Sequence, residues 1–256
     1  PQPFGGRGLS GTGPKAGGPH YLRRFTRPAG AAPPPDENVA ASGAPAAVPL
    51  PLRELCAAQM EWAASPGRGP LLRQFADALP ADLGRMARDV LARLAAFESA
   101  PAELHGVTGE RNIYSLEARG IFLCLGGGDN TGETLVRQSF TCLATGNGAV
   151  VAENYNAEAA RALAAAAIRA RLPGQLLVRA GGDPISLASR EGLAGIAFDG
   201  GGKKLRDLRI ALAELPGARR ALLRADDGFE RFMAEKLVST DTTAAGGNAT
   251  LLAEAG

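Results

Sequence analysis

Five short apolar runs alternate with longer amphipathic stretches between residues 121 and 223, and this alternation constrains the fold more than any other feature. The apolar runs are 121–125, 149–152, 176–178, 195–198 and 221–223, and the stretches between them include 130–143, 157–172 and 203–215. Short strands that alternate with helices of ten or more residues predict βαβ units, hence a parallel sheet with helices on both faces. We therefore expect an α/β fold, with a Rossmann-like sheet at residues 105–237.

Two different kinds of segment precede this region. Residues 52–104 carry apolar side chains at three- and four-residue spacing, which predicts amphipathic helices separated by prolines. Residues 28–51 are rich in Pro, Ala and Gly and hold almost no large apolar side chain, so they cannot bury enough surface to offset their ordering entropy. We interpret 28–51 as a flexible linker after a Gly/Pro-rich N-terminal segment, 1–27. The first residue is not Met, and we expect the chain to be a fragment.

A glycine-rich turn follows the first predicted strand. A strand, a glycine loop and a helix N-terminus together can bind a pyrophosphate, which makes Gly126, Gly128 and Gly132 candidate cofactor-binding residues. Glu153, at the end of the next strand, lies where a ribose-binding acid belongs in a dinucleotide fold. The spacing is G-x-G-x-x-x-G rather than G-x-G-x-x-G. Glycines that only turn the chain therefore remain the alternative interpretation.

Charge, cysteine and histidine content exclude several other classes of site. Lys and Arg total 28 against 26 Asp and Glu, with neither sign in a long block, so nucleic acid is not an expected partner. No apolar run reaches about 18 residues and no signal peptide opens the chain, so we expect a cytoplasmic protein without a membrane span. The three cysteines lack a Cys-x-x-Cys spacing and the histidines, His20 and His105, lie far apart, so neither a disulfide framework nor a metal site is expected.

Motifs at the two ends of the chain carry a more specific signal. Residues 2–19 resemble the C-terminal active-site loop of aldehyde dehydrogenases, and the Gly-Thr-Gly-Pro-Lys-Ala-Gly-Gly portion resembles the glutamate semialdehyde dehydrogenase branch. The segments Thr-Gly-Glu-Arg-Asn-Ile-Tyr at 108–114 and Thr-Thr-Ala-Ala-Gly-Gly-Asn-Ala-Thr at 242–250 are similar to the C-terminal domain and terminal motif of long bacterial proline utilization A proteins. The linker at 28–51 carries no resemblance.

The resemblance implies part of a bifunctional flavoenzyme, with a proline dehydrogenase that uses FAD and a glutamate semialdehyde dehydrogenase that uses NAD. The catalytic Cys and general-base Glu of that family would lie upstream, so we expect no catalytic residue, no bound cofactor and no activity in this chain alone. By position, Ser10 and Gly11 would hold the substrate carboxylate, and Phe4 would pack near the active site. Successive Gly amides and a Ser hydroxyl suit an anion.

The resemblance also assigns roles to the rest of the chain. The Rossmann-like domain would be noncatalytic and would cover the channel between the two active sites, with the upstream dehydrogenase and flavin domains as its partners. Residues 238–256 would dock as a strand on another domain. The sequence does not decide whether the protein forms a homo-oligomer. The alternative is an independent Rossmann-type nucleotide-binding oxidoreductase domain, and the glycine turn at 126–132 discriminates between the two.

Overall fold

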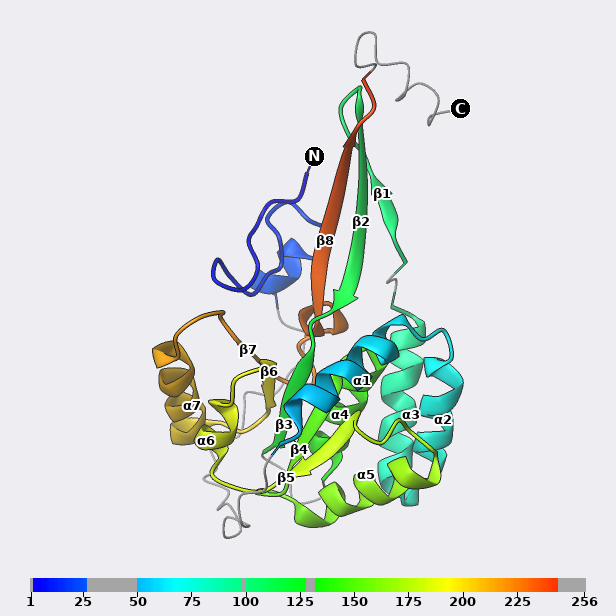
Figure 1. The fold of residues 1–256 in the computed structure, drawn as a ribbon, viewed down its shortest axis with the longest axis vertical. Coiled ribbons are helices and arrows are strands. Elements are labelled where there is room, and N and C mark those ends of the chain that lie inside the picture. Colours follow the sequence, from blue (N-terminus) through cyan, green and yellow to red (C-terminus); the bar gives the residue numbers. More distant parts are fainter. Residues whose placement is uncertain (1, 27–49, 98–99, 128–131, 244–256) are drawn as a thin grey trace.

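The computed structural model describes residues 2–26, 50–97, 100–127 and 132–243. In these ranges a five-stranded sheet flanked by helices forms one end of the molecule, and a long antiparallel arm projects from it (Figure 1). None of the helices in these ranges is long and apolar enough to cross a membrane.

The five predicted strands form one parallel sheet in the order β5-β4-β3-β6-β7. Their bounds are β3 (Ile121–Gly126), β4 (Gly148–Ala152), β5 (Leu177–Ala180), β6 (Leu193–Phe198) and β7 (Ala221–Leu223). Every residue of the central strand β3 is buried, because helices cover it on both faces. The predicted α/β class and parallel sheet are thus confirmed.

Side chains alternate across β3 and divide the core in two. Phe122 and Cys124 face a cluster that includes residues of α4 (Glu133–Ala144) and α5 (Ala157–Arg169). Ile121, Leu123 and Leu125 face the opposite cluster, which draws on α6 (Pro184–Ala188) and α7 (Gly202–Glu214). The short helix α6 was not predicted, and begins where Asp183 accepts a hydrogen bond from the Ser186 N–H.

The helices before the sheet belong to the same core. They are α1 (Leu52–Ala64), α2 (Arg68–Asp77) and α3 (Ala81–Ala95). Phe75 stacks on Phe140 of α4 with ring centroids 4.6 Å apart, and the Trp62 indole N–H donates to the Leu143 carbonyl at 2.7 Å. The helical segment that we expected at 52–104 is therefore packed against α4 rather than standing apart.

The arm is a second, antiparallel sheet, of which we expected only a strand from residue 238 onwards. It consists of β1 (Ala102–Leu104), β2 (Glu110–Ala118) and β8 (Met233–Asp241), in the order β1-β2-β8. The long pair β2/β8 runs from Glu110 opposite Asp241 to Ala118 opposite Met233. Strand β2 thus starts within the motif at 108–114 that carries the resemblance. Residue 238, the expected start of a separate docking segment, lies within β8, so residues 238–241 pair inside this chain.

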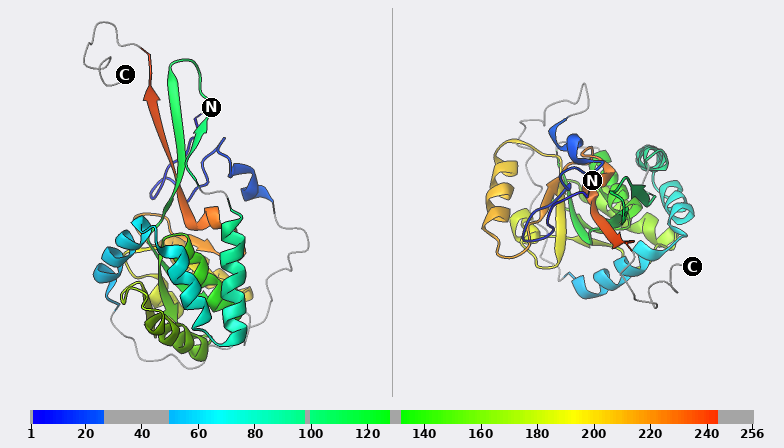
Figure 2. Two further views of the ribbon diagram at one scale, coloured as in Figure 1. Left: turned by 90° about the vertical axis from the view of Figure 1, so that its right-hand side faces the viewer. Right: turned by 90° about the horizontal axis from the view of Figure 1, so that it is seen from above.

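The N-terminal segment lies beside the arm (Figures 1 and 2). It consists of the loop 2–19 and a short 3-10 helix, η1 (Tyr21–Phe25), and it contacts β8, which follows a second 3-10 helix, η2 (Phe229–Phe232). The two ends of the described chain therefore meet at the arm.

Candidate functional site

The loop 2–19 closes on itself through its backbone. Phe4 and Ala16 exchange two hydrogen bonds, with N–H to carbonyl distances of 2.9 and 2.7 Å, and Gly8 pairs with Gly11. Gly6 packs against Ser10 so closely that a β-carbon at position 6 would lie 2.1 Å from the Ser10 Cβ. The loop can therefore fold in this way only with glycine at position 6.

The residues expected to bind substrate lie on the outer part of this loop. Ser10 is exposed, and among the residues that the structure describes its hydroxyl makes no hydrogen bond. Phe4 exposes 84% of its surface, and Leu9, Leu22 and Phe25 are also large exposed apolar side chains. All four lie in the N-terminal segment 2–26.

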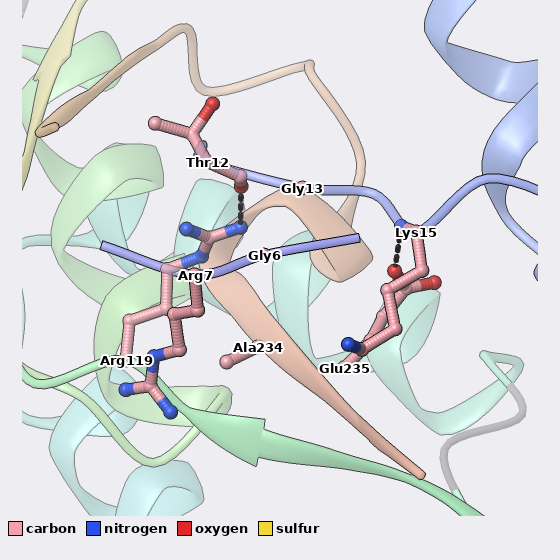
Figure 3. Close-up of a pocket in the computed structure, with 8 residues that line it drawn as sticks. All are labelled: Gly6, Arg7, Thr12, Gly13, Lys15, Arg119, Ala234 and Glu235. Atoms are coloured by element: carbon pink, nitrogen blue, oxygen red, sulfur yellow. Dashed lines mark hydrogen bonds between the residues drawn. The ribbon is translucent and has the colours of Figure 1, made fainter. Parts of the chain in front are cut away.

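The base of the arm holds the inner part of the loop (Figure 3). The Arg119 guanidinium donates to the Thr12 carbonyl and, through Nε, to the Met233 carbonyl at 2.8 Å. The Glu235 carboxylate accepts the Lys15 backbone N–H on one oxygen. A cavity of about 20 Å³ lies between the loop and these side chains, room for about one water molecule.

Electrostatics around this cavity favour an anion. Arg7, Lys15 and Arg119 line it together with a single carboxylate, Glu235. Burial, followed by the charges of Arg7 and Arg231, lowers the pKa of Arg119 to about 10. At neutral pH the guanidinium still carries its charge.

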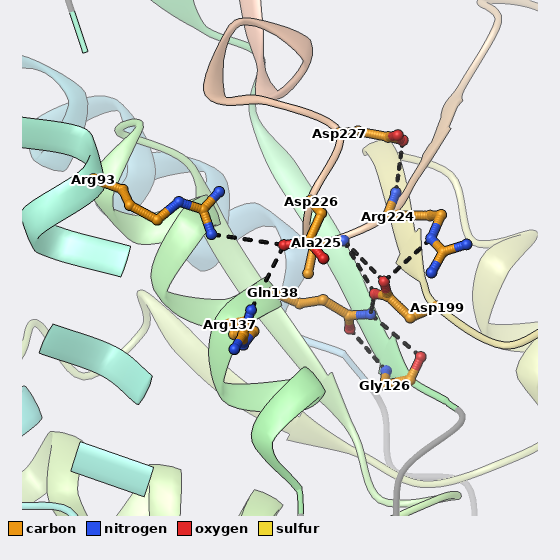
Figure 4. Close-up of polar contacts among 9 residues, drawn as sticks. All are labelled: Arg93, Gly126, Arg137, Gln138, Asp199, Arg224, Ala225, Asp226 and Asp227. Carbon is orange, nitrogen blue, oxygen red and sulfur yellow. Dashed lines mark hydrogen bonds and ion pairs between the residues drawn. The ribbon is translucent and has the colours of Figure 1, made fainter. Parts of the chain in front are cut away.

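Gly126, where the glycine turn begins, bonds through its backbone to a side chain of the same chain (Figure 4). The Gly126 N–H donates to the Gln138 side-chain oxygen at 2.8 Å, and the Gly126 carbonyl accepts from the Gln138 amide at 3.2 Å. Gly132 has φ +80°, and a β-carbon there would lie 2.3 Å from the Ala159 Cβ. Packing and chain reversal thus account for both glycines, while Gly128 lies outside the described residues.

Gln138 also belongs to a buried network around Asp199. Its amide donates to the Asp199 carboxylate at 2.6 Å, the Ala225 N–H donates to the same carboxylate at 3.0 Å, and Arg224 approaches it to 3.5 Å. Burial raises the pKa of Asp199 above its usual value, against the opposing effect of these hydrogen bonds. The network joins β6, α4 and the segment after β7, which is a structural role.

The remaining candidates do not assemble around the glycine turn. The Glu153 carboxylate pairs with Arg179 at 2.6 Å rather than standing free for ribose hydroxyls. The thiols of Cys124 and Cys142 are fully buried with their sulfurs 3.8 Å apart, as expected for apolar packing. In the part of the chain that the structure describes, no three His, Cys, Asp or Glu side chains form a metal-binding group. Glu153 and the two thiols are thus each engaged in contacts within the chain.

The sequence analysis missed Arg119, Glu235 and Asn147. Asn147 is fully buried at the base of the arm, where its side-chain oxygen accepts the N–H groups of Arg119 and Gly120 at 2.7 and 2.9 Å. Its amide donates to the Phe232 carbonyl at 2.9 Å. Each of these contacts joins residues far apart in the sequence, so no local spacing marks them.

Comparison with known proteins identifies relatives of the chain. No family model matches the chain. Over 98% of its length the chain is 33% identical to the bifunctional protein PutA of Rhizobium meliloti and also to that of Escherichia coli (strain K12). In both cases it spans only 18% of the length of the relative.

Solved structures share the fold. A mutant of proline utilization A from Bradyrhizobium japonicum matches with a TM-score of 0.59 and 21% identity, over 70% of this chain and 22% of that one. An NAD-dependent benzaldehyde dehydrogenase from Corynebacterium glutamicum matches with a TM-score of 0.57 and 14% identity, over 68% of this chain and 44% of that one. At these identities the structures establish the aldehyde dehydrogenase fold alone. The sequence matches along 98% of its length show that the chain belongs to the proline utilization A family.

Proposed function

We propose that this chain is part of a bifunctional proline-oxidising enzyme. It would supply the substrate anchor loop of the glutamate semialdehyde dehydrogenase, at residues 1–27, and a noncatalytic domain that covers the channel between the two active sites. The complete enzyme would oxidise proline with FAD and then oxidise the semialdehyde to glutamate with NAD. The matches to bifunctional PutA proteins along nearly the whole chain support this assignment.

The proposal rests on one observation, an exposed Ser10 hydroxyl on a loop whose backbone is held in place. The Ser10 hydroxyl is exposed and unpaired among the described residues, while the loop behind it is fixed by the arm. A hydroxyl and the neighbouring Gly11 backbone form a neutral donor group of the kind that binds a carboxylate. The substrate would therefore be oriented by its carboxylate, with Phe4 beside it.

The proposed role as a channel cover requires contact with another domain, and the exposed apolar side chains of the N-terminal segment would supply it. Phe4, Leu9, Leu22 and Phe25 would pack against the upstream dehydrogenase domain of the same chain. Residues 238–241 pair with β2 of this chain, so they are not available to dock on another domain. Docking is therefore proposed for the residues after β8, and those from 244 onwards lie outside the described residues. Deleting 244–256 spares β8 and should introduce a lag in NADH formation from proline while sparing each half-reaction. A truncated enzyme without a lag would contradict the cover role.

The alternative of an independent nucleotide-binding domain is less favoured. The Gly126 N–H and the Glu153 carboxylate, which would contact a dinucleotide, are occupied by Gln138 and Arg179. No residue of this chain is proposed as catalytic, and we expect the purified chain to form no NADH from glutamate semialdehyde.

The anchor is tested by Ser10→Ala in the full-length enzyme. A hydrogen bond to a charged group contributes about 1.5 to 3 kcal/mol, so KM for glutamate semialdehyde should rise roughly ten- to a hundred-fold. An aldehyde of the same length without a carboxylate should be unaffected, and Ser189→Ala at the end of α6 serves as the matched control. Equal losses for both aldehydes would contradict the anchor.

A further inference from the structure

Two side chains from the arm fix the loop immediately after its substrate-binding residues. Arg119, just after β2, donates to the carbonyl of Thr12, two residues after Ser10. Glu235, on β8, accepts the backbone N–H of Lys15. The loop is therefore attached to the arm at both ends of its 12–15 segment.

Each side chain is itself held by a second contact. Arg119 also donates to the Met233 carbonyl at 2.8 Å, and the second oxygen of Glu235 accepts the Tyr114 hydroxyl at 2.7 Å. Tyr114 is 4% exposed on β2, so this partly buried hydrogen bond orients the carboxylate toward the loop. The Lys15 ammonium then donates to the Gly5 carbonyl at 2.7 Å, which ties the two sides of the loop together.

These contacts make the loop's conformation depend on the arm. Hydrogen bonds with a charged partner are about twice as strong as neutral ones, and both attachments contain a charged side chain. The attachment points are backbone groups, so they set the path of the chain rather than the position of one side chain. A shift of about 1 Å at an orienting group can lower a rate about a hundred-fold.

We propose that Arg119 and Glu235 are positioning residues for the dehydrogenase reaction. They would hold the loop so that Ser10 and Gly11 meet the substrate carboxylate, although neither side chain touches the substrate. This inference rests on the proposed anchor function of the loop. It assigns the arm a role in substrate recognition, beyond covering a channel.

The test uses the full-length enzyme with Arg119→Ala and Glu235→Ala. Each should raise KM for glutamate semialdehyde about ten- to a hundred-fold with a smaller change in kcat, and leave KM for the carboxylate-free aldehyde within about two-fold. Arg119→Lys and Glu235→Gln, which retain a donor and an acceptor, should restore most of the loss. Lys236→Ala is the matched control, because this neighbour on β8 pairs with Glu117 on the exposed side.

Ser10→Ala, measured in parallel, separates the two proposals. If Ser10→Ala is selective for the semialdehyde but Arg119→Ala and Glu235→Ala are not, the positioning role is wrong and the anchor stands. If Ser10→Ala is not selective, the anchor itself fails. If an alanine variant does not fold, the conservative variant decides. A small residual rise in KM for glutamate semialdehyde alone in Arg119→Lys or Glu235→Gln supports positioning, whereas equal changes with both aldehydes, or no change with either, overturn it.

Discussion

Replacing Asn147 by alanine should weaken the attachment of the arm to the parallel sheet and lower the free energy of unfolding. The Asn147 side chain makes hydrogen bonds to four groups: the N–H groups of Arg119 and Gly120, the Thr145 hydroxyl at 2.8 Å and the Phe232 carbonyl at 2.9 Å. The side chain is fully buried. Alanine removes all four contacts, although the Thr145 hydroxyl keeps its hydrogen bonds to the carbonyls of Thr141 and Cys142.

The size of the effect follows from these contacts. At about 1 kcal/mol net for each hydrogen bond, and with a water molecule replacing part of the loss, Asn147→Ala should lower the free energy of unfolding by about 3 to 4 kcal/mol. That is a large share of the roughly 5 to 15 kcal/mol that stabilises a typical domain. If the free energy of unfolding falls by about 2 kcal/mol for each molar of urea, the urea concentration at the unfolding midpoint should fall by about 1.5 to 2 M.

Urea unfolding followed by circular dichroism measures this change, with Gln74→Ala as a control. Gln74 is an exposed amide on α2, and its removal should change the unfolding free energy by less than about 0.5 kcal/mol. Hydrogen exchange should also find that the amides of Arg119 and Gly120 lose protection in Asn147→Ala. A loss below about 1 kcal/mol with an unchanged urea dependence would refute the reasoning.

Two further changes test the packing and the electrostatics of the sheet domain. Gly132→Ala should destabilise the fold by about 2 to 4 kcal/mol, because φ is +80° and the new β-carbon would meet Ala159, whereas Gly174→Ala, in open space, should change thermal stability little. Burial raises the folded-state pKa of Asp199, so its contribution to stability is complete below the unfolded pKa of about 3.9 and is lost as pH rises through the folded value. Asp199→Asn should therefore gain stability relative to the native chain as pH rises above about 4 in urea unfolding, and a relative loss over that range would contradict the assignment.

The sequence predicted the parallel sheet because burial on both faces leaves a strong local signal. Strand β3 is a continuous apolar run, Ile121 to Leu125, and helices of ten or more residues connect most of its neighbours. The arm left no comparable signal. Strand β2 mixes charged, polar and apolar residues, and its partner β8 lies more than a hundred positions later. A strand was expected only from residue 238 onwards, and its pairing with β2 leaves no local signal.

The candidate site was also predicted from the sequence only in part. The loop 2–19 was recognised from its motif, including Ser10 and Gly11, because its residues are consecutive. The attachments by Arg119 and Glu235 join positions 107 and 220 residues apart, and spacing carries no information about such contacts. The glycine turn resembled a phosphate site because it follows a strand and precedes a helix. The sequence alone does not show that the Gly126 N–H donates to the Gln138 side chain.

The attachment of the loop to β8 has a consequence for synthesis. Lys15 and Glu235 are 220 residues apart, and at about 5 to 20 residues per second the ribosome needs roughly 10 to 40 s to make the second after the first. During that interval the sheet domain can assemble, since its strands emerge in order, while the loop still lacks its last contact. A nascent chain that stops before residue 235 keeps the loop sequence but not the carboxylate that fixes it. Completion of the loop thereby becomes one of the last events in the maturation of this region.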